Sequence, residues 1–149
     1  MIFADLELQP SDDLNSLRPY LKFLPRRGNG PQRAAQPCKA HDGCRCAAYE
    51  VRPSYCRQFD CKLLKRLQKR SVTDSGAMRI VRKTRAKVQR VEELLEALGD
   101  SDKSRPLLAR VKRANRQLPK ADLAALHSEL SLAWHELTCL LGAHFYSPP

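Results

Sequence analysis

The chain has 149 residues, with 27 lysines and arginines against 16 aspartates and glutamates, which gives a formal net charge of +11. No stretch approaches the roughly 20 apolar residues of a membrane-spanning helix, and the acidic N-terminal segment lacks the basic start and apolar run of a secretory signal. We therefore expect a cytoplasmic protein with no membrane partner. Its charge favours acidic partners without specifying one.

Residues 1–37 predict a lead-in with little regular structure. Ile2, Leu6 and Leu8 alternate with acidic residues and predict a short strand. Ser11 is the expected N-cap of a short helix that carries three leucines and that Pro19 must kink or divide. The segment 25–37 has three prolines, two glycines and no apolar periodicity, so it predicts a loop.

The cysteines are the strongest indication of function. Five of the six fall within the 24 residues 38–61: Cys38, Cys44, Cys46, Cys56 and Cys61. A thiol is a modest core residue and a reducing cytosol disfavours disulfides, so the cluster predicts metal binding, with disulfides and inert thiols as alternatives. Sulfur ligands favour zinc or iron, the latter as an ion or in an iron–sulfur centre.

Local patterns add structural detail to the prediction for residues 38–61. Cys44 and Cys46 point to opposite sides of an extended chain, so one of them is expected to stay outside the ligand shell. Residues 47–51 are expected to pair briefly as a strand, and Arg52-Pro53 to start a turn or a short helix that runs through Cys56.

Residues 46–61, CAAYEVRPSYCRQFDC, resemble the pattern C-x-x-Y-x-x-R-P-x-x-C-R-x-F-x-C of the bacterial cysteine-cluster (YkgJ-like) family of zinc- or iron-chelating domains. The resemblance implies that the metal ligands are Cys38, Cys46, Cys56 and Cys61, with Cys44 as the extra cysteine. Supporting roles are expected for the residues between them: Tyr49 and Phe59 shield the site from water, and Arg52 and Arg57 donate to thiolates or carbonyls.

The chain departs from that family in one respect. No cysteine precedes Cys38, so the family's earlier C-x-x-C-x-x-C-C motif has no counterpart. Either the encoded start lies downstream of the true one, or the protein is a reduced variant that holds one metal at most.

The remaining sequence predicts helices. Leucines among lysines and arginines indicate a short basic helix over 62–70 that ends near 71–76. Apolar residues at alternating spacings of three and four predict helices over 81–98, which Gly99 ends, over 107–118, and from near Pro119 to Gly142. The expected fold class is mainly α: an irregular cysteine-rich metal module followed by an antiparallel three-helix bundle. The expected domains are a lead-in over 1–37, a cysteine module with its basic helix over 38–74, and the bundle over 75–149.

Basic residues crowd the segment 62–90, where Asp74 is the single acidic residue. An acidic protein or a nucleic acid could contact Lys62, Lys65, Arg66, Lys69, Arg70, Arg82 and Lys83, although a solvated helix face explains the same pattern. Base-stacking aromatic residues are missing from this segment, so any nucleic-acid contact is expected to be salt-sensitive and unspecific.

Other candidate ligands are weaker. His41 is close to the cluster but is expected in an exposed turn. His135 and Cys139 share a helix face, and Cys139 is expected to be a buried, inert residue.

The predicted function is a small cytoplasmic zinc- or iron-binding cysteine-cluster protein. One alternative is a basic nucleic-acid-binding or scaffolding protein with a structural zinc. Another, implied by one branch of the resembling family, is a component of a methylation-type protein-modifying system. No catalytic motif is recognisable, so no catalytic residue is predicted.

Overall fold

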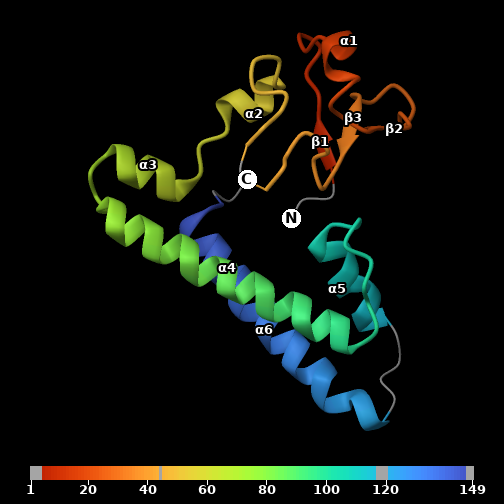
Figure 1. Cartoon of the computed structure of the whole chain (residues 1–149), viewed down its shortest axis with the longest axis vertical. Coiled ribbons are helices and arrows are strands. Elements are labelled where there is room, and N and C mark those ends of the chain that lie inside the picture. The colour runs from red at the N-terminus through yellow and green to blue at the C-terminus, as the bar shows by residue number, and fades with distance from the viewer. Residues whose placement is uncertain (1–4, 44, 117–120, 147–149) are drawn as a thin grey trace. The chain divides into compact units, whose positions relative to one another are not determined.

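The computed structural model describes residues 5–43, 45–116 and 121–146 (Figure 1). The chain divides into two compact units. The first contains the described residues up to Phe59 together with Asp102–Ala109, and the second contains Asp60–Ser101 and the described residues from Arg110 onward. The units therefore divide the N-terminal part of the chain after residue 59, whereas the sequence-based domains end at 37 and 74.

The first unit contains a small antiparallel sheet in the order β1-β3-β2. Its strands are β1 (Asp5–Glu7), β2 (Phe23–Leu24) and β3 (Arg33–Ala35). The expectation of a loop over 25–37 is wrong for β3, which is the central strand. Ala34 of β3 is opposite Leu6 on one side and Phe23 on the other, and it is fully buried. A three-residue strand without β-branched residues leaves too short a pattern to recognise.

Helix α1 (Leu14–Leu17) follows β1 and ends before Pro19, as expected. Its N-cap is Asp13 and not Ser11, because the Asp13 carboxylate accepts hydrogen bonds from the backbone N–H groups of Asn15 and Ser16. The helix contributes Leu17 to a small core, against which Cys38 and Cys46 pack. The buried members of that core are Leu8, Leu17, Leu21, Ala34, Ala40 and Ala48.

The second unit is built on two long helices, α4 (Asp74–Ala97) and α6 (Ala124–His144), preceded by α3 (Lys62–Gln68). A 3-10 turn, η1 (Ala121–Leu123), leads into α6. Helices α4 and α6 run antiparallel, since Lys87 pairs with Glu136 and Arg90 with Glu129 (Figure 1). Their apolar stripes are buried where the period predicts, at Val91, Leu95, Leu130 and Leu137, and Leu141 is buried as well in place of the expected Leu140.

The mainly helical class is confirmed. Helix α5 (Leu107–Arg116) begins in the first unit and ends in the second. Within the described residues it does not pack along α4 or α6 to the extent that these two pack on each other, so the three-helix bundle is not confirmed. Over the same residues, no helix has the length and apolar character needed to cross a membrane.

Helix boundaries differ from expectation at the end of α6, which runs past Gly142 to His144, and at the start of α4. Helix α4 begins at Asp74 and not near 81, because the Thr73 side-chain oxygen caps it by accepting a hydrogen bond from Gly76 N–H at 3.1 Å. Gly76 therefore lies in the first turn of a helix and not in the expected break. At the other end Gly99 adopts a φ of +85° and ends α4 as predicted. The predicted helix start near Pro119 lies outside the described residues.

Candidate metal centre

A tight reversal of the chain brings Cys46 back toward the segment that begins at Cys38. The backbone N–H of His41 donates to the Cys38 carbonyl at 3.1 Å, and His41 forms an isolated β-bridge with Cys46. The N–H of Ala47 then donates to the Ala40 carbonyl at 2.7 Å. Residues 47–50 continue as a turn, so the strand expected over 47–51 is absent from this described segment.

The turn between His41 and Cys46 is stabilised by a glycine with a positive φ and by side-chain hydrogen bonds. Gly43 has a φ of +97°, a conformation that side-chain-bearing residues rarely adopt. The Asp42 carboxylate accepts a hydrogen bond from Arg45 N–H at 2.6 Å. His41 is exposed, as predicted, and its Nδ1 atom accepts from Gly43 N–H at 3.2 Å. The His41 ring thus stabilises the turn through this hydrogen bond.

Cys56 is carried by the short helix α2 (Ser54–Gln58), which starts after Pro53 as the sequence predicts. A buried carboxylate anchors the start of this helix. Oδ1 of Asp12 accepts from the Ser54 backbone N–H at 2.8 Å and from the Ser54 hydroxyl at 2.6 Å, while Oδ2 accepts from Gln9 N–H at 2.8 Å. Asp12 therefore ties α2 to the N-terminal segment, 42 residues away in sequence.

The ionisation of Asp12 fits this role. Burial by itself raises the pKa of the Asp12 carboxyl, but the hydrogen bonds from Ser54 and Gln9 and the charge of Arg57 outweigh it, so the net pKa is lowered. Asp12 is consequently a charged acceptor at neutral pH. Nothing in the sequence around Asp12 points to a partner in α2, because the two are 42 residues apart.

Three of the predicted ligands influence one another within the first unit. Cys56 is exposed as a residue, yet partial burial of its thiol raises its pKa, and the neighbouring Cys38 and Cys46 raise it further. The charge of Arg52 acts in the opposite direction. Cys38, Cys46 and Cys56 come from three separate segments, so their proximity is produced by the fold.

The arrangement is not a finished coordination shell. Over the residues that the structure describes, no three histidine, cysteine, aspartate or glutamate side chains are placed to hold a metal ion. Cys61 belongs to the second unit, where it is the N-cap of α3 and its Sγ accepts from Leu64 N–H at 3.3 Å. Cys44 lies outside the described residues. The four-cysteine ligand set therefore stays a prediction.

The residues expected to support the ligands have varied surroundings. The Arg52 guanidinium stacks over the Tyr49 ring, with its Cζ atom 3.9 Å from the ring centroid. Arg57 lies close enough to Asp12 for its charge to lower that pKa. Tyr49 is 55% exposed and Phe59 is 58% exposed, so the shielding of a metal by these two side chains stays a prediction.

On α6, His135 and Cys139 share a face as predicted, with His135 Nε2 3.6 Å from Cys139 Sγ. The expected burial of Cys139 is wrong, because this residue is exposed. The apolar run around Cys139 suggested a core position, but that run spans several faces of the helix and only Leu137 and Leu141 within it are buried.

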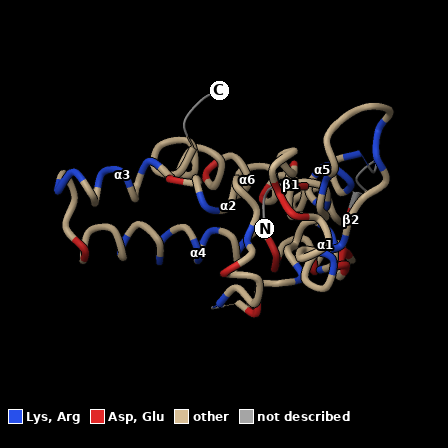
Figure 2. Tube along the Cα trace, turned by 90° about the horizontal axis from the view of Figure 1, so that it is seen from above, with Lys and Arg blue, Asp and Glu red and all other residues tan. Residues whose placement is uncertain are grey.

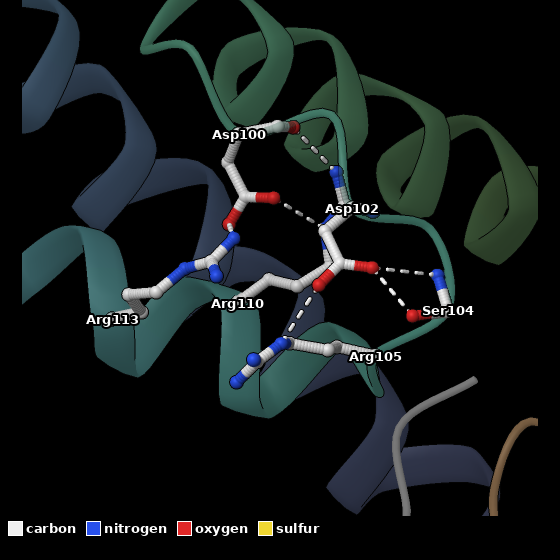
Figure 3. A network of polar contacts seen from close by, with 6 residues as sticks. All are labelled: Asp100, Asp102, Ser104, Arg105, Arg110 and Arg113. Atoms are coloured by element: carbon white, nitrogen blue, oxygen red, sulfur yellow. Dashed lines mark hydrogen bonds and ion pairs between the residues drawn. The ribbon is translucent and has the colours of Figure 1, made fainter.

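A buried charged pair joins Asp100, which follows α4, to Arg110 of α5, and no sequence pattern predicts it (Figure 3). Arg110 is only 2% exposed, and it donates from Nε to Asp100 Oδ1 at 3.2 Å and from Nη2 to the Asp100 carbonyl at 2.9 Å. Nη2 of Arg113 reaches Asp100 Oδ2 at 2.8 Å. This network is structural, since it joins Asp100 to two arginines of α5 within the second unit.

Comparison with family models, with curated proteins and with solved structures finds no match for this chain. The resemblance to the YkgJ-like family consequently rests on the cysteine pattern alone.

Proposed function

We propose that this protein binds a single zinc or iron ion through its cysteine cluster. The observation that carries the proposal is the proximity of three cysteines from separate segments: Cys38 and Cys46 pack against one small core, and Cys56 is close enough for both to raise its pKa. That core contains three leucines and three alanines as its buried members, which is little apolar surface to hold a loop-rich unit together. A metal bound by the thiols would add folding free energy where apolar burial is small.

The chemistry of the donors fits such an ion. Neighbouring thiols resist ionisation because each thiolate repels the next, and burial adds to this resistance. A divalent cation makes the thiolate more stable than the thiol, since a coordinated thiol loses its proton outright. Soft sulfur donors select zinc or iron over magnesium or calcium. Ligation requires the three side chains to turn toward a common centre, which rotation about their χ1 bonds allows.

The fourth ligand is assigned from the sequence pattern. Cys61 follows Cys56 after four intervening residues, a loop long enough to chelate one ion, and Cys44 is the alternative. Four thiolates would close the shell of a structural zinc, whereas three would leave a position open.

Elemental analysis of protein purified without added metal tests the proposal. We expect about one zinc or iron per chain, and thiol titration before and after chelation should show the ligating cysteines becoming reactive. An iron protein would be coloured and a zinc protein colourless. Absence of zinc, iron and copper above background would refute the proposal.

Serine substitutions assign the ligands. Cys38→Ser, Cys46→Ser and Cys56→Ser should each release the metal, while Cys139→Ser, at an exposed position on α6, is the matched control and should leave the stoichiometry unchanged. Loss of metal in Cys61→Ser with retention in Cys44→Ser would support the pattern-based assignment. The reverse outcome would require the site to be rebuilt around Cys44.

A second candidate function is favoured by the surplus of positive charge on α3 and α4. Residues 62–90 contain eleven lysines and arginines and one acidic residue. This surplus supports binding of an acidic partner, either a nucleic acid or an acidic protein for which the chain acts as a scaffold. The cysteines and the basic helices occupy different segments, so both functions can belong to one protein.

A further inference from the structure

Lysines and arginines recur along both α3 and α4 (Figure 2). The contacts that these residues make within the fold differ from one residue to another. Nζ of Lys87 pairs with Glu136 on α6, and Arg90 pairs with Glu129 at 2.6 Å. Nζ of Lys62 donates to the Gly142 carbonyl at the C-terminal end of α6. These contacts hold α3 and the later part of α4 against α6.

Two more basic side chains have neighbours of their own. Nη1 of Arg66 lies 3.4 Å from His144 Nδ1. Lys83 is close enough to Glu136 for its charge to help lower the pKa of that carboxyl, after the hydrogen bond and charge of Lys87. Lys62, Arg66 and Lys83 were all expected to contact a partner, yet each is engaged within the second unit.

Six further basic residues of the segment 62–90 are exposed. Arg85 lines a hollow beside Phe145, and the other five are Lys65, Lys69, Arg70, Arg79 and Arg82. We call these five the open basic surface. In the described part of the chain, no carboxylate forms an ion pair with any of them. They lie on α3, on the turn after it and on the first half of α4.

Folding accounts for only part of this surface. Lys65 lies in the last turn of α3 and Lys69 is its C-cap, where basic residues are stabilised by the helix dipole. Arg79 and Arg82 gain nothing of this kind, because they lie in the first half of α4 and are three positions apart, so like charges face each other. A like-charged pair of this kind destabilises a helix by about 0.2–0.5 kcal/mol. Folding therefore gives no reason for the two arginines.

We infer that the open basic surface binds the phosphate backbone of a nucleic acid duplex. This inference rests on the second candidate function and specifies its site and partner. Several fixed positive charges on two connected helices complement a regular array of phosphates, and arginine can bind a phosphate through two hydrogen bonds. Residues 62–90 contain no aromatic side chain, so base stacking, the usual means of binding single strands, is missing.

The surroundings of the surface favour nucleic acid over a lipid membrane. A helix that lies on a membrane inserts a broad apolar face beside its basic residues. The main apolar residues of α4, Val91, Leu94 and Leu95, are buried inside the second unit. The exposed large apolar residues beside the surface are Leu64 on α3 and Met78 on α4, which do not make up a broad apolar face.

The test compares two quadruple charge reversals in the full-length protein. The first is Lys65→Glu, Lys69→Glu, Arg79→Glu and Arg82→Glu. The matched control reverses four exposed basic residues elsewhere: Arg27→Glu, Lys39→Glu, Lys112→Glu and Arg116→Glu. Both variants lower the formal net charge from +11 by the same amount. Circular dichroism and metal content should be unchanged in both.

Binding is measured by fluorescence polarisation with a short labelled DNA duplex, the single strand of the same sequence and a series of salt concentrations. The wild type should prefer the duplex, with affinity falling steeply as salt rises. The slope of log K against log salt changes by about 0.9 for each phosphate contact, so the first variant should lose roughly 3 to 4 from that slope. The control should keep most of the wild-type slope.

Three results would overturn the inference. Equal losses in the two variants would show that net charge alone attracts the duplex, leaving nucleic-acid binding intact but the surface unassigned. Binding to phosphatidylserine vesicles without binding to nucleic acid would show that the partner of the surface is a membrane and not a nucleic acid. No binding by the wild type even at low salt would also remove nucleic acid from the second candidate function, while the metal content would still decide the first.

Discussion

Substitution of Asp12 by alanine should loosen α2 and weaken metal binding through Cys56. The change removes three hydrogen bonds of 2.6–2.8 Å that a charged carboxylate accepts from Ser54 and Gln9. Bonds to a charged group contribute about 1.5–3 kcal/mol each, but water can reach the half-buried donors after the change. We therefore expect a loss of about 2–3 kcal/mol for the whole anchor, a large part of the stability of a small domain.

Hydrogen exchange measured by mass spectrometry locates this effect. Peptides covering residues 46–58 should exchange faster in Asp12→Ala, whereas peptides from α6 should not change. Asp13→Ala is the matched control, because Asp13 is the adjacent carboxylate and caps only the exposed start of α1. Its effect should be confined to residues 13–18.

The pH dependence gives a second check on the anchor. The pKa of Asp12 is lowered in the folded protein, so its contribution to stability is complete above the unfolded value of about 3.9 and is lost as the pH falls through the lowered folded value. The difference between wild type and Asp12→Ala should therefore be constant at neutral pH and shrink in acid. Equal exchange rates over 46–58 in Asp12→Ala and Asp13→Ala would refute the reasoning.

Three further predictions concern other parts of the chain. Zinc affinity, measured by chelator competition, should rise with pH because the thiols must lose protons, and the raised pKa of Cys56 should also make the metal-free protein less stable above about pH 8.5; a flat profile would contradict thiolate ligation. Asp100→Ala should destabilise the second unit by about 3–5 kcal/mol, because it leaves the buried Arg110 charge without its partner, and Trp134 fluorescence during urea unfolding measures this. Thr73→Ala should cost about 1 kcal/mol by removing the cap of α4, and Thr73→Ser should restore most of that loss in thermal unfolding.

The helices whose apolar pattern repeats over many turns could be predicted from the sequence. The apolar spacing that marked two long helices placed Val91, Leu95, Leu130 and Leu137 correctly in the core. A long helix repeats its pattern over many turns, so an error at one position does not hide it. Gly99 was recognisable as a helix end because the required backbone conformation favours glycine.

Features created by contacts between distant residues could not be predicted. Strand β3 owes its existence to pairing with β1 and β2 on both sides, since Arg33-Ala34-Ala35 has no strand preference of its own. The partner of Asp12 lies in α2, far along the chain. The proximity of Cys38, Cys46 and Cys56 was expected from their pattern, but the side-chain positions that would decide a ligand set are not fixed by spacing.

The first compact unit is discontinuous in sequence, because it takes in Asp102–Ala109 after more than forty residues that belong to the second unit. During synthesis the N-terminal strands and the cysteines leave the ribosome well before this last piece. The first unit therefore cannot be completed until the long helix α4 has emerged, and the N-terminal segment spends that interval without its late contacts. If the proposed metal is bound, its early capture by the cysteines would protect the nascent segment during this delay, before the finished protein exists.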